Sequence, residues 1–149
     1  MSTGPTVVLG RSCDNCTMCC KLPEIPELAK PKQQWCSNCD IGKGCKIYAE
    51  RPETCREFYC HYLLDKNLDE HWKPSRSRMI VTFNRRKSWL RIDVDPARPN
   101  AWRGEPYYSD LKRWARNAQR VNEHVVVVVG DTGTLVLPDG EKRLDDASD

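Results

Sequence analysis

All nine cysteines of this 149-residue chain lie between residues 13 and 60, and none follows. Their spacing is C-x2-C-x2-C-C, then fifteen residues, then C-x2-C-x5-C-x9-C-x4-C. The first 60 residues contain few Val, Ile, Leu or Phe, so apolar burial alone could not offset the entropy of ordering them. Such a segment needs cross-links. The available cross-linking residues are Cys13, Cys16, Cys19, Cys20, Cys36, Cys39, Cys45, Cys55 and Cys60.

The cross-links could be disulfides or metal ions. Residues 1–10 lack the basic start and the apolar run of a secretory signal peptide. The longest apolar run, residues 125–129, is far shorter than the roughly 20 residues of a membrane-spanning helix. We therefore expect a cytoplasmic protein with reduced thiols and no membrane partner. An odd cysteine count also disfavours a closed disulfide framework. Metal binding is the favoured interpretation, and disulfides or a reactive thiol are the alternatives.

The spacing of the cysteines is typical of metal ligands. Two thiolates in C-x2-C can chelate one tetrahedral ion, and this unit opens the run of residues 13–20. Cys19 and Cys20 are adjacent, so their side chains diverge, and we expect them to serve different ions or one of them to bridge two. In residues 36–45, C-x2-C precedes a Gly-x-Gly turn and a third cysteine, which predicts a knuckle. All nine cysteines are therefore predicted metal ligands.

The chain predicts an α+β fold in a single domain over residues 1–149. A cysteine-cluster metal-binding segment with short helices is expected over residues 13–65. A small antiparallel ββαββ sheet with one packed helix is expected over residues 78–140. The predicted elements are a helix over 53–65, strands over 79–83 and 88–94, a helix from 108 or 109 to about 121, and strands over 125–129 and 134–137.

Charge is unevenly distributed along the chain. Residues 71–120 contain 13 Lys or Arg against 4 Asp or Glu, whereas residues 121–149 contain 2 against 7. A basic middle predicts either an internal match with the acidic tail or an anionic partner. Arg85, Arg86 and Lys87 could contact phosphates while a tryptophan stacks on bases. A solvated hairpin tip is the favoured interpretation, and nucleic-acid binding is the alternative.

Two motifs carry a family resemblance. Residues 13–20 read CxxCxxCC, and residues 45–60 read C-x-I-Y-x-x-R-P-x-x-C-R-x-F-x-C. Together they resemble the CxxCxxCC zinc- or iron-chelating domain family of bacterial cysteine-cluster proteins (YkgJ-like). The resemblance covers about residues 13–63 and implies metal chelation and a bacterial origin. It implies no particular reaction, and it leaves zinc and iron open.

Zinc is the favoured metal, because four thiolates complete its tetrahedron. Two such sites would leave one cysteine over, whereas three ions with bridging thiolates could use all nine. An iron–sulfur cluster is the alternative, although the Cys-Pro continuation of a ferredoxin motif is absent. Soft thiolates could also hold Cu(I).

The sequence therefore predicts a metal-binding protein with zinc in a multi-cysteine thiolate cluster, serving metal chelation, metal handling or structural binding. One alternative is an iron–sulfur protein with a redox or enzymatic role, and another is a small zinc-stabilised nucleic-acid-binding module. No Ser/His/Asp triad or carboxylate pair can be argued from the residue order. Catalytic residues are therefore unassigned, and whether the protein is an enzyme stays open.

Overall fold

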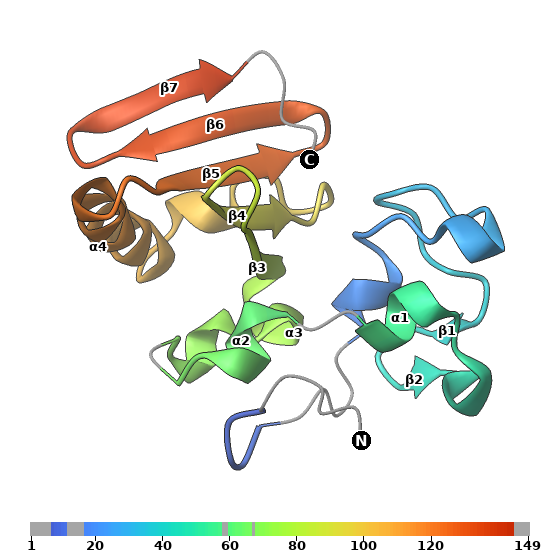
Figure 1. The fold of residues 1–149 in the computed structure, drawn as a ribbon. Helices are drawn as coiled ribbons and strands as arrows, with labels where there is room; N and C mark the ends of the chain where they lie inside the picture. Colours follow the sequence, from blue (N-terminus) through green and yellow to red (C-terminus); the bar gives the residue numbers. More distant parts are fainter. Residues whose placement is uncertain (1–6, 12–16, 58–59, 67, 145–149) are drawn as a thin grey trace.

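The computed structural model describes residues 7–11, 17–57, 60–66 and 68–144. Its largest element is a five-stranded sheet in the order β3-β4-β5-β6-β7, which Figure 1 shows from one side. Within the described residues, no helix is long and apolar enough to cross a membrane. The strands are β3 (Met79–Asn84), β4 (Trp89–Val94), β5 (His124–Val129), β6 (Thr132–Leu137) and β7 (Gly140–Leu144).

The sheet is mixed, which corrects the expected antiparallel ββαββ arrangement. β4 and β5 are parallel, and the other neighbouring strands are antiparallel. Between β4 and β5 the chain passes through helix α4 (Tyr107–Arg120), and such a crossover returns the second strand in the direction of the first. β7 is a fifth strand, beyond the last strand predicted from the sequence. Its charged side chains are tolerated because it lies at the sheet edge.

Part of the hydrophobic core lies between the sheet and α4. Val125, Val126, Val127 and Val128 are each at most 2% exposed, so β5 is covered on both faces. α4 packs on β5 and β6. Its buried residues Leu111, Ala115 and Ala118 follow the helical period predicted from the sequence.

The cysteine-rich half, whose elements lie within residues 18–64, is built from short elements. Few apolar residues are available there to support longer ones, and Figure 1 shows this half beside β3, away from β7. The short elements are η1 (Met18–Cys20), η2 (Pro26–Leu28), β1 (Cys39–Asp40), β2 (Gly44–Cys45), η3 (Tyr48–Glu50), α1 (Glu53–Glu57) and α2 (His61–Leu64). The connection to the sheet adds η4 (Glu70–Trp72) and α3 (Pro74–Ser77), and η5 (Ala101–Arg103) precedes α4.

The helix expected over residues 53–65 is divided into α1 and α2. Cys60 precedes α2 in an extended conformation, with φ −72° and ψ 146°, which a continuous helix does not allow. The change of direction places Tyr62 and Leu63 in the core, at 5% and 7% exposure. An ideal helix would have separated Cys55 from Cys60 by about 140°. The break removes this constraint on the two thiols.

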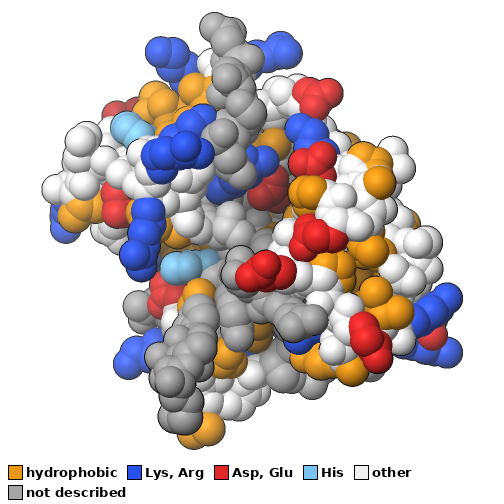
Figure 2. Space-filling model, turned by 45° about the vertical axis from the view of Figure 1, so that its right-hand side comes forward, with side chains coloured by type: hydrophobic (Ala, Val, Ile, Leu, Met, Phe, Trp, Pro, Cys, Tyr) orange, Lys and Arg blue, Asp and Glu red, His pale blue; other side chains and the backbone are white. Residues whose placement is uncertain are grey.

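Apolar and ionic contacts join the cysteine-rich half to the sheet. Met18 and Leu22 belong to the same buried cluster as Val81 and Val127. The guanidinium of Arg11 donates hydrogen bonds to the carbonyls of Tyr62, Asp65 and Leu68. The apolar contacts show that burial contributes to holding the cysteine-rich half against the sheet. At the surface, hydrophobic, basic and acidic side chains are intermixed on the face shown in Figure 2.

A buried ion network reinforces this junction. Asp95 is fully buried; Lys21 Nζ lies 2.6 Å from its Oδ1, and a guanidinium nitrogen of Arg78 lies 2.7 Å from its Oδ2. Burial raises the pKa of Asp95, but the hydrogen bonds from Lys21 and from the amide of Ala97, together with the two positive charges, lower it more. The pKa of Asp95 therefore lies below its ordinary value.

Candidate metal site

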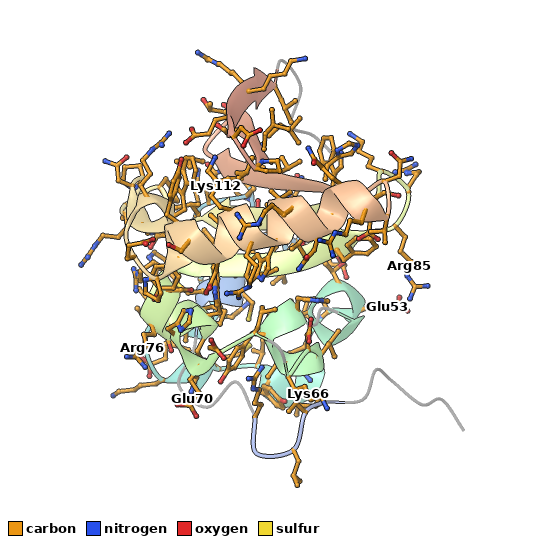
Figure 3. All side chains as sticks on the ribbon, turned by 90° about the vertical axis from the view of Figure 1, so that its left-hand side faces the viewer. Glu53, Lys66, Glu70, Arg76, Arg85 and Lys112 are labelled. Carbon is orange, nitrogen blue, oxygen red and sulfur yellow. The ribbon has the colours of Figure 1, made fainter. Side chains whose placement is uncertain are left out.

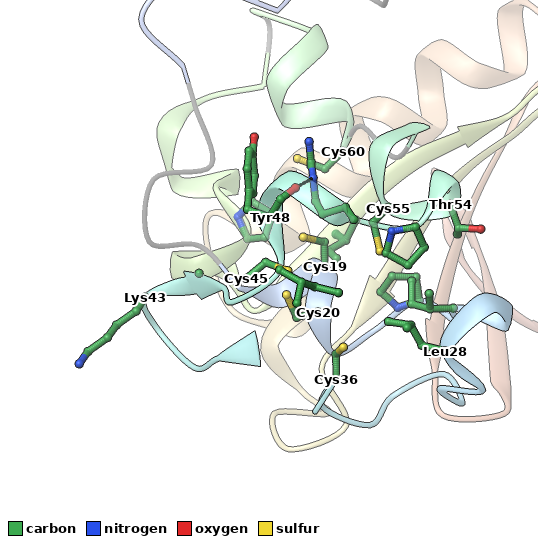
Figure 4. Close-up of a pocket in the computed structure, with 18 of the residues that line it drawn as sticks. Cys19, Cys20, Leu28, Cys36, Lys43, Cys45, Tyr48, Thr54, Cys55 and Cys60 are labelled. Atoms are coloured by element: carbon green, nitrogen blue, oxygen red, sulfur yellow. Dashed lines mark hydrogen bonds between the residues drawn. The ribbon is translucent and has the colours of Figure 1, made fainter. Parts of the chain in front are cut away.

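Thiols from separate segments surround one cavity. Its volume is about 340 Å³. Figure 4 shows the labelled cysteines around this space, together with Tyr48 and Thr54. Apolar residues such as Ile25, Leu28 and Ile80 form much of the remaining wall. The lining cysteines are Cys19, Cys20, Cys36, Cys45, Cys55 and Cys60.

The predicted knuckle is present in the structure. β1 and β2 form a small antiparallel pair in which Cys39 lies opposite Cys45. The turn between them places Gly42 at φ +78°, a left-handed conformation that glycine adopts without strain. The amide of Asn38 donates to Cys36 Sγ at 3.4 Å. Of the three knuckle cysteines, Cys36 and Cys45 line the cavity.

The other thiols reach the cavity from three further segments. Cys19 and Cys20 lie on η1, Cys55 lies on α1, and Cys60 lies just before α2. Cys20 hydrogen-bonds to both Cys19 and Cys39, which links η1 to the knuckle. Residues far apart in the sequence are thus brought together, as the prediction of a shared cluster requires.

The described cysteines are all free thiols: Cys19, Cys20, Cys36, Cys39, Cys45, Cys55 and Cys60 form no disulfide. The predicted ligands Cys13 and Cys16 lie outside the described residues. For the seven described positions, the disulfide alternative receives no support from the structure.

Two cations lie beside the thiols. Lys30 is only 5% exposed, and its ammonium donates to the carbonyls of Lys21, Pro23 and Pro31. Arg51 lines the cavity, and its Nε donates to the carbonyl oxygen of Tyr48 at 3.0 Å. Lys30 could not be singled out from the sequence, because an isolated lysine in a proline-rich connector ordinarily faces solvent. Its positive charge partly compensates the negative charge of nearby thiolates.

The thiols differ in acidity. A hydrogen bond from Cys20 lowers the pKa of Cys19 to about 7 against the opposing effect of burial, and Arg51 and Lys30 assist. The same hydrogen bond and burial raise the pKa of Cys20. Burial raises the pKa of Cys39 and of Cys55, and neighbouring thiolates add to this effect. The cavity therefore resists holding several bare thiolates, and a bound cation would relieve this repulsion.

The thiols are more widely spaced than a single zinc ion requires. Four thiolates on one Zn²⁺ lie about 3.8 Å apart, given Zn–S bonds of about 2.3 Å in a tetrahedron. Among the described residues, the one set of three or more His, Cys, Asp or Glu ligand atoms lying within 4.8 Å of one another contains no cysteine. The donor chemistry suits a soft metal. The distances between the sulfurs suit a cluster of several ions, or a site in which the thiols move closer together when a metal ion binds.

The set that does meet this distance is Asp69, His71 and Asp110, which the sequence did not indicate. Asp110 already accepts hydrogen bonds from His71 at 2.7 Å and from Trp72 Nε1 at 2.8 Å, and Arg113 lies 3.0 Å away. These donors satisfy the carboxylate of Asp110, so it does not require a metal ion. We interpret the group as a structural network that fixes η4 on α4.

No protein-family model, curated protein or solved structure matches this chain. The family resemblance of the two cysteine motifs therefore stays an expectation, and the functional argument depends on the chemistry of the cavity.

Proposed function

We propose that this protein binds metal in a multi-cysteine thiolate cluster and that its role is metal chelation, metal handling or structural binding. The observation that carries the proposal is the convergence of six thiols on one cavity. They come from four separate segments of the chain. Several reduced thiols brought together in this way form a set of metal ligands with high affinity for soft cations.

The surroundings of the cavity support the same proposal. Lys30 and Arg51 offset the charge of a thiolate-rich cluster, and groups around a site commonly tune a bound metal in this way. The short elements that carry the cysteines bury little apolar surface of their own. Metal binding would therefore contribute directly to the folding free energy of this half.

Zinc is our first candidate, since Cys36 and Cys39 have the C-x2-C sequence spacing of structural zinc sites. An iron–sulfur cluster is the second candidate, and the wide separation of the thiols favours it. In such a cluster the cysteines bind different iron atoms, so the sulfurs need not converge on a single ion.

Elemental analysis of anaerobically purified protein tests the proposal and separates the two candidates. Stoichiometric zinc in a colourless protein would support the first, whereas iron, acid-labile sulfide and visible absorption would support the second. Protein purified under these conditions that contains no transition metal and takes up none on titration would contradict both.

The variant Cys55→Ser tests whether the cavity is the site. We expect it to contain less metal and to melt at a lower temperature, because metal-binding energy here is also folding energy. Thr54→Ser is the matched control: it also lines the cavity, and serine retains the hydroxyl that donates to Glu27. Full metal content and an unchanged melting curve in Cys55→Ser would exclude that thiol as a ligand.

A further inference from the structure

Two basic segments that are distant in the sequence meet at one end of the sheet. The parallel register pairs Trp89 of β4 with His124 of β5, and the amide of His124 donates to the carbonyl of Ser88 at 2.9 Å. The β3–β4 hairpin tip therefore lies beside the segment that follows α4. In Figure 3, Arg85 projects at the end of the molecule where α4 terminates. We call this surface the basic end; its basic residues are Arg85, Arg86, Lys87, Arg116 and Arg120.

The arginines of the basic end are not neutralised within the described part of the chain. All four are exposed, and none of them forms an ion pair there. Two acidic residues of the last third pair elsewhere, Glu141 with Arg103 and Asp131 with Lys32, whereas Glu123 lies in the segment after α4 at this end. β7 also runs away from this end, because Leu144 pairs with Gly133 at the opposite end of the sheet.

Aromatic and apolar side chains accompany the charges. Lys87 Nζ lies 4.5 Å from the ring centroid of Trp89, which is itself half-buried. Phe83, on the strand that leads into the hairpin, is 37% exposed, and Val121 after α4 is 63% exposed. Basic groups that contact phosphates, combined with aromatic faces that stack on bases, are the general composition of a single-strand binding surface.

We propose that the basic end binds single-stranded nucleic acid. The arginines contact successive phosphates, and Trp89 or Phe83 stacks on a base. Adjacent strands lie about 4.8 Å apart, so the hairpin end of β3 is about 10 Å from His124 on β5, and one extended single strand can span from the hairpin to the segment that follows Arg120. A single strand fits better than a duplex, whose stacked bases would leave the aromatic rings without a partner. This proposal does not depend on the proposed metal site.

Fluorescence anisotropy of a fluorescein-labelled 12-nucleotide oligo(dT), and of the equivalent oligo(U), with the full chain as purified tests the proposal. For four phosphate contacts on a single strand, the logarithm of the affinity should fall with log[salt] at a slope of about −2.8. The affinity should therefore drop about 50-fold between 50 and 200 mM salt. An affinity that is undetectable at 50 mM salt, or independent of salt, would overturn the proposal.

Charge reversal locates the surface. Arg85→Glu combined with Arg86→Glu should weaken binding at least tenfold at 50 mM salt and reduce the slope by about 1.4, since two contacts are lost. Lys142→Glu combined with Arg143→Glu is the control; it makes the same change in net charge on β7, at the far edge of the sheet. Equal losses in the two double variants would show a non-specific charge effect and overturn the assignment.

Two further measurements complete the test. Trp89→Leu should weaken binding while leaving the salt slope unchanged, because stacking releases no counterions; Phe83→Leu provides a second variant should the tryptophan be needed for folding. Circular dichroism melting curves establish that each variant is folded. Vesicles of phosphatidylserine form the last arm, and binding to vesicles without binding to either oligonucleotide would assign the surface to lipid and overturn the proposal.

Discussion

Replacement of Lys30 by methionine would test how the cysteine cavity is held together. The ammonium of Lys30 donates to the carbonyl oxygens of Lys21 at 2.9 Å and Pro31 at 3.0 Å, and also to that of Pro23. Methionine has a similar length but no donor, so the variant leaves the carbonyls of half-buried Lys21 and Pro23 and of exposed Pro31 without this partner. It also removes a positive charge that faces the thiols.

The expected loss of stability follows from these contacts. A hydrogen bond contributes about 1 kcal/mol net, so the loss of three costs about 3 kcal/mol together. For a chain of this size each kcal/mol lowers the melting temperature by about 2–4 °C. We therefore expect Lys30→Met to melt roughly 6–12 °C below the wild-type protein, and to bind metal less tightly because the thiolates lose a compensating charge.

Thermal melting followed by circular dichroism, with parallel metal analysis, measures both effects. Lys32→Met is the matched control, because it removes a lysine two residues away whose side chain is 52% exposed and pairs with Asp131, which is 94% exposed. Such surface pairs contribute about 0–1 kcal/mol. If the two variants melted together and held equal metal, Lys30 would not be the structural cation that we describe.

Three further predictions concern the junctions of the fold. The low pKa of Asp95 means that the stability contributed by its carboxylate is complete above the unfolded-state pKa, near 3.9, and is lost as pH falls through the lower folded-state value. The free energy of unfolding, measured in urea from pH 7 to 3, should therefore depend less on pH in Asp95→Asn than in the wild-type protein. The same pH dependence in both proteins would contradict this. Arg11→Ala should lose about 2 kcal/mol and expose the Leu68 region to hydrogen exchange, whereas unchanged exchange would show that Arg11 does not anchor the N-terminal segment. Trp72→Phe should cost about 1–2 kcal/mol by removing the indole donor to Asp110, and a smaller loss on chemical denaturation would show that His71 and Arg113 suffice for that carboxylate.

Features set by neighbouring residues were predictable from the sequence. The Gly-x-Gly turn returns the chain so that Cys39 meets Cys45, as expected from the glycine spacing. The hairpin of β3 and β4 has its polar turn at residues 85–88, where the alternation of apolar residues stops. The amphipathic period also located α4 correctly, with Leu111, Ala115 and Ala118 buried. In each case the conformation depends on contacts within a few residues.

Other features depend on partners that are distant in the sequence. The residue pattern did not show the parallel pairing of β4 with β5, because strand direction is decided by how α4 crosses the sheet. It did not show the break at Cys60 either, since the segment has helical character throughout and only packing of Tyr62 and Leu63 into the core redirects it. β7 was missed because its charged sequence forms a strand only with β6 beside it.

The sequence by itself determined which residues we propose as metal ligands, because nine cysteines in 48 positions are a concentration that a chain of this composition does not otherwise need. It also determined the local turns and amphipathic faces, which depend on steric and hydrophobic preferences of adjacent residues. Only the tertiary structure decided that thiols from four segments share one cavity, that Lys30 lies beside them, and that two basic segments meet at one end of the sheet. Those arrangements follow from long-range packing, whose free energy is spread over many contacts and leaves no signature at any single position.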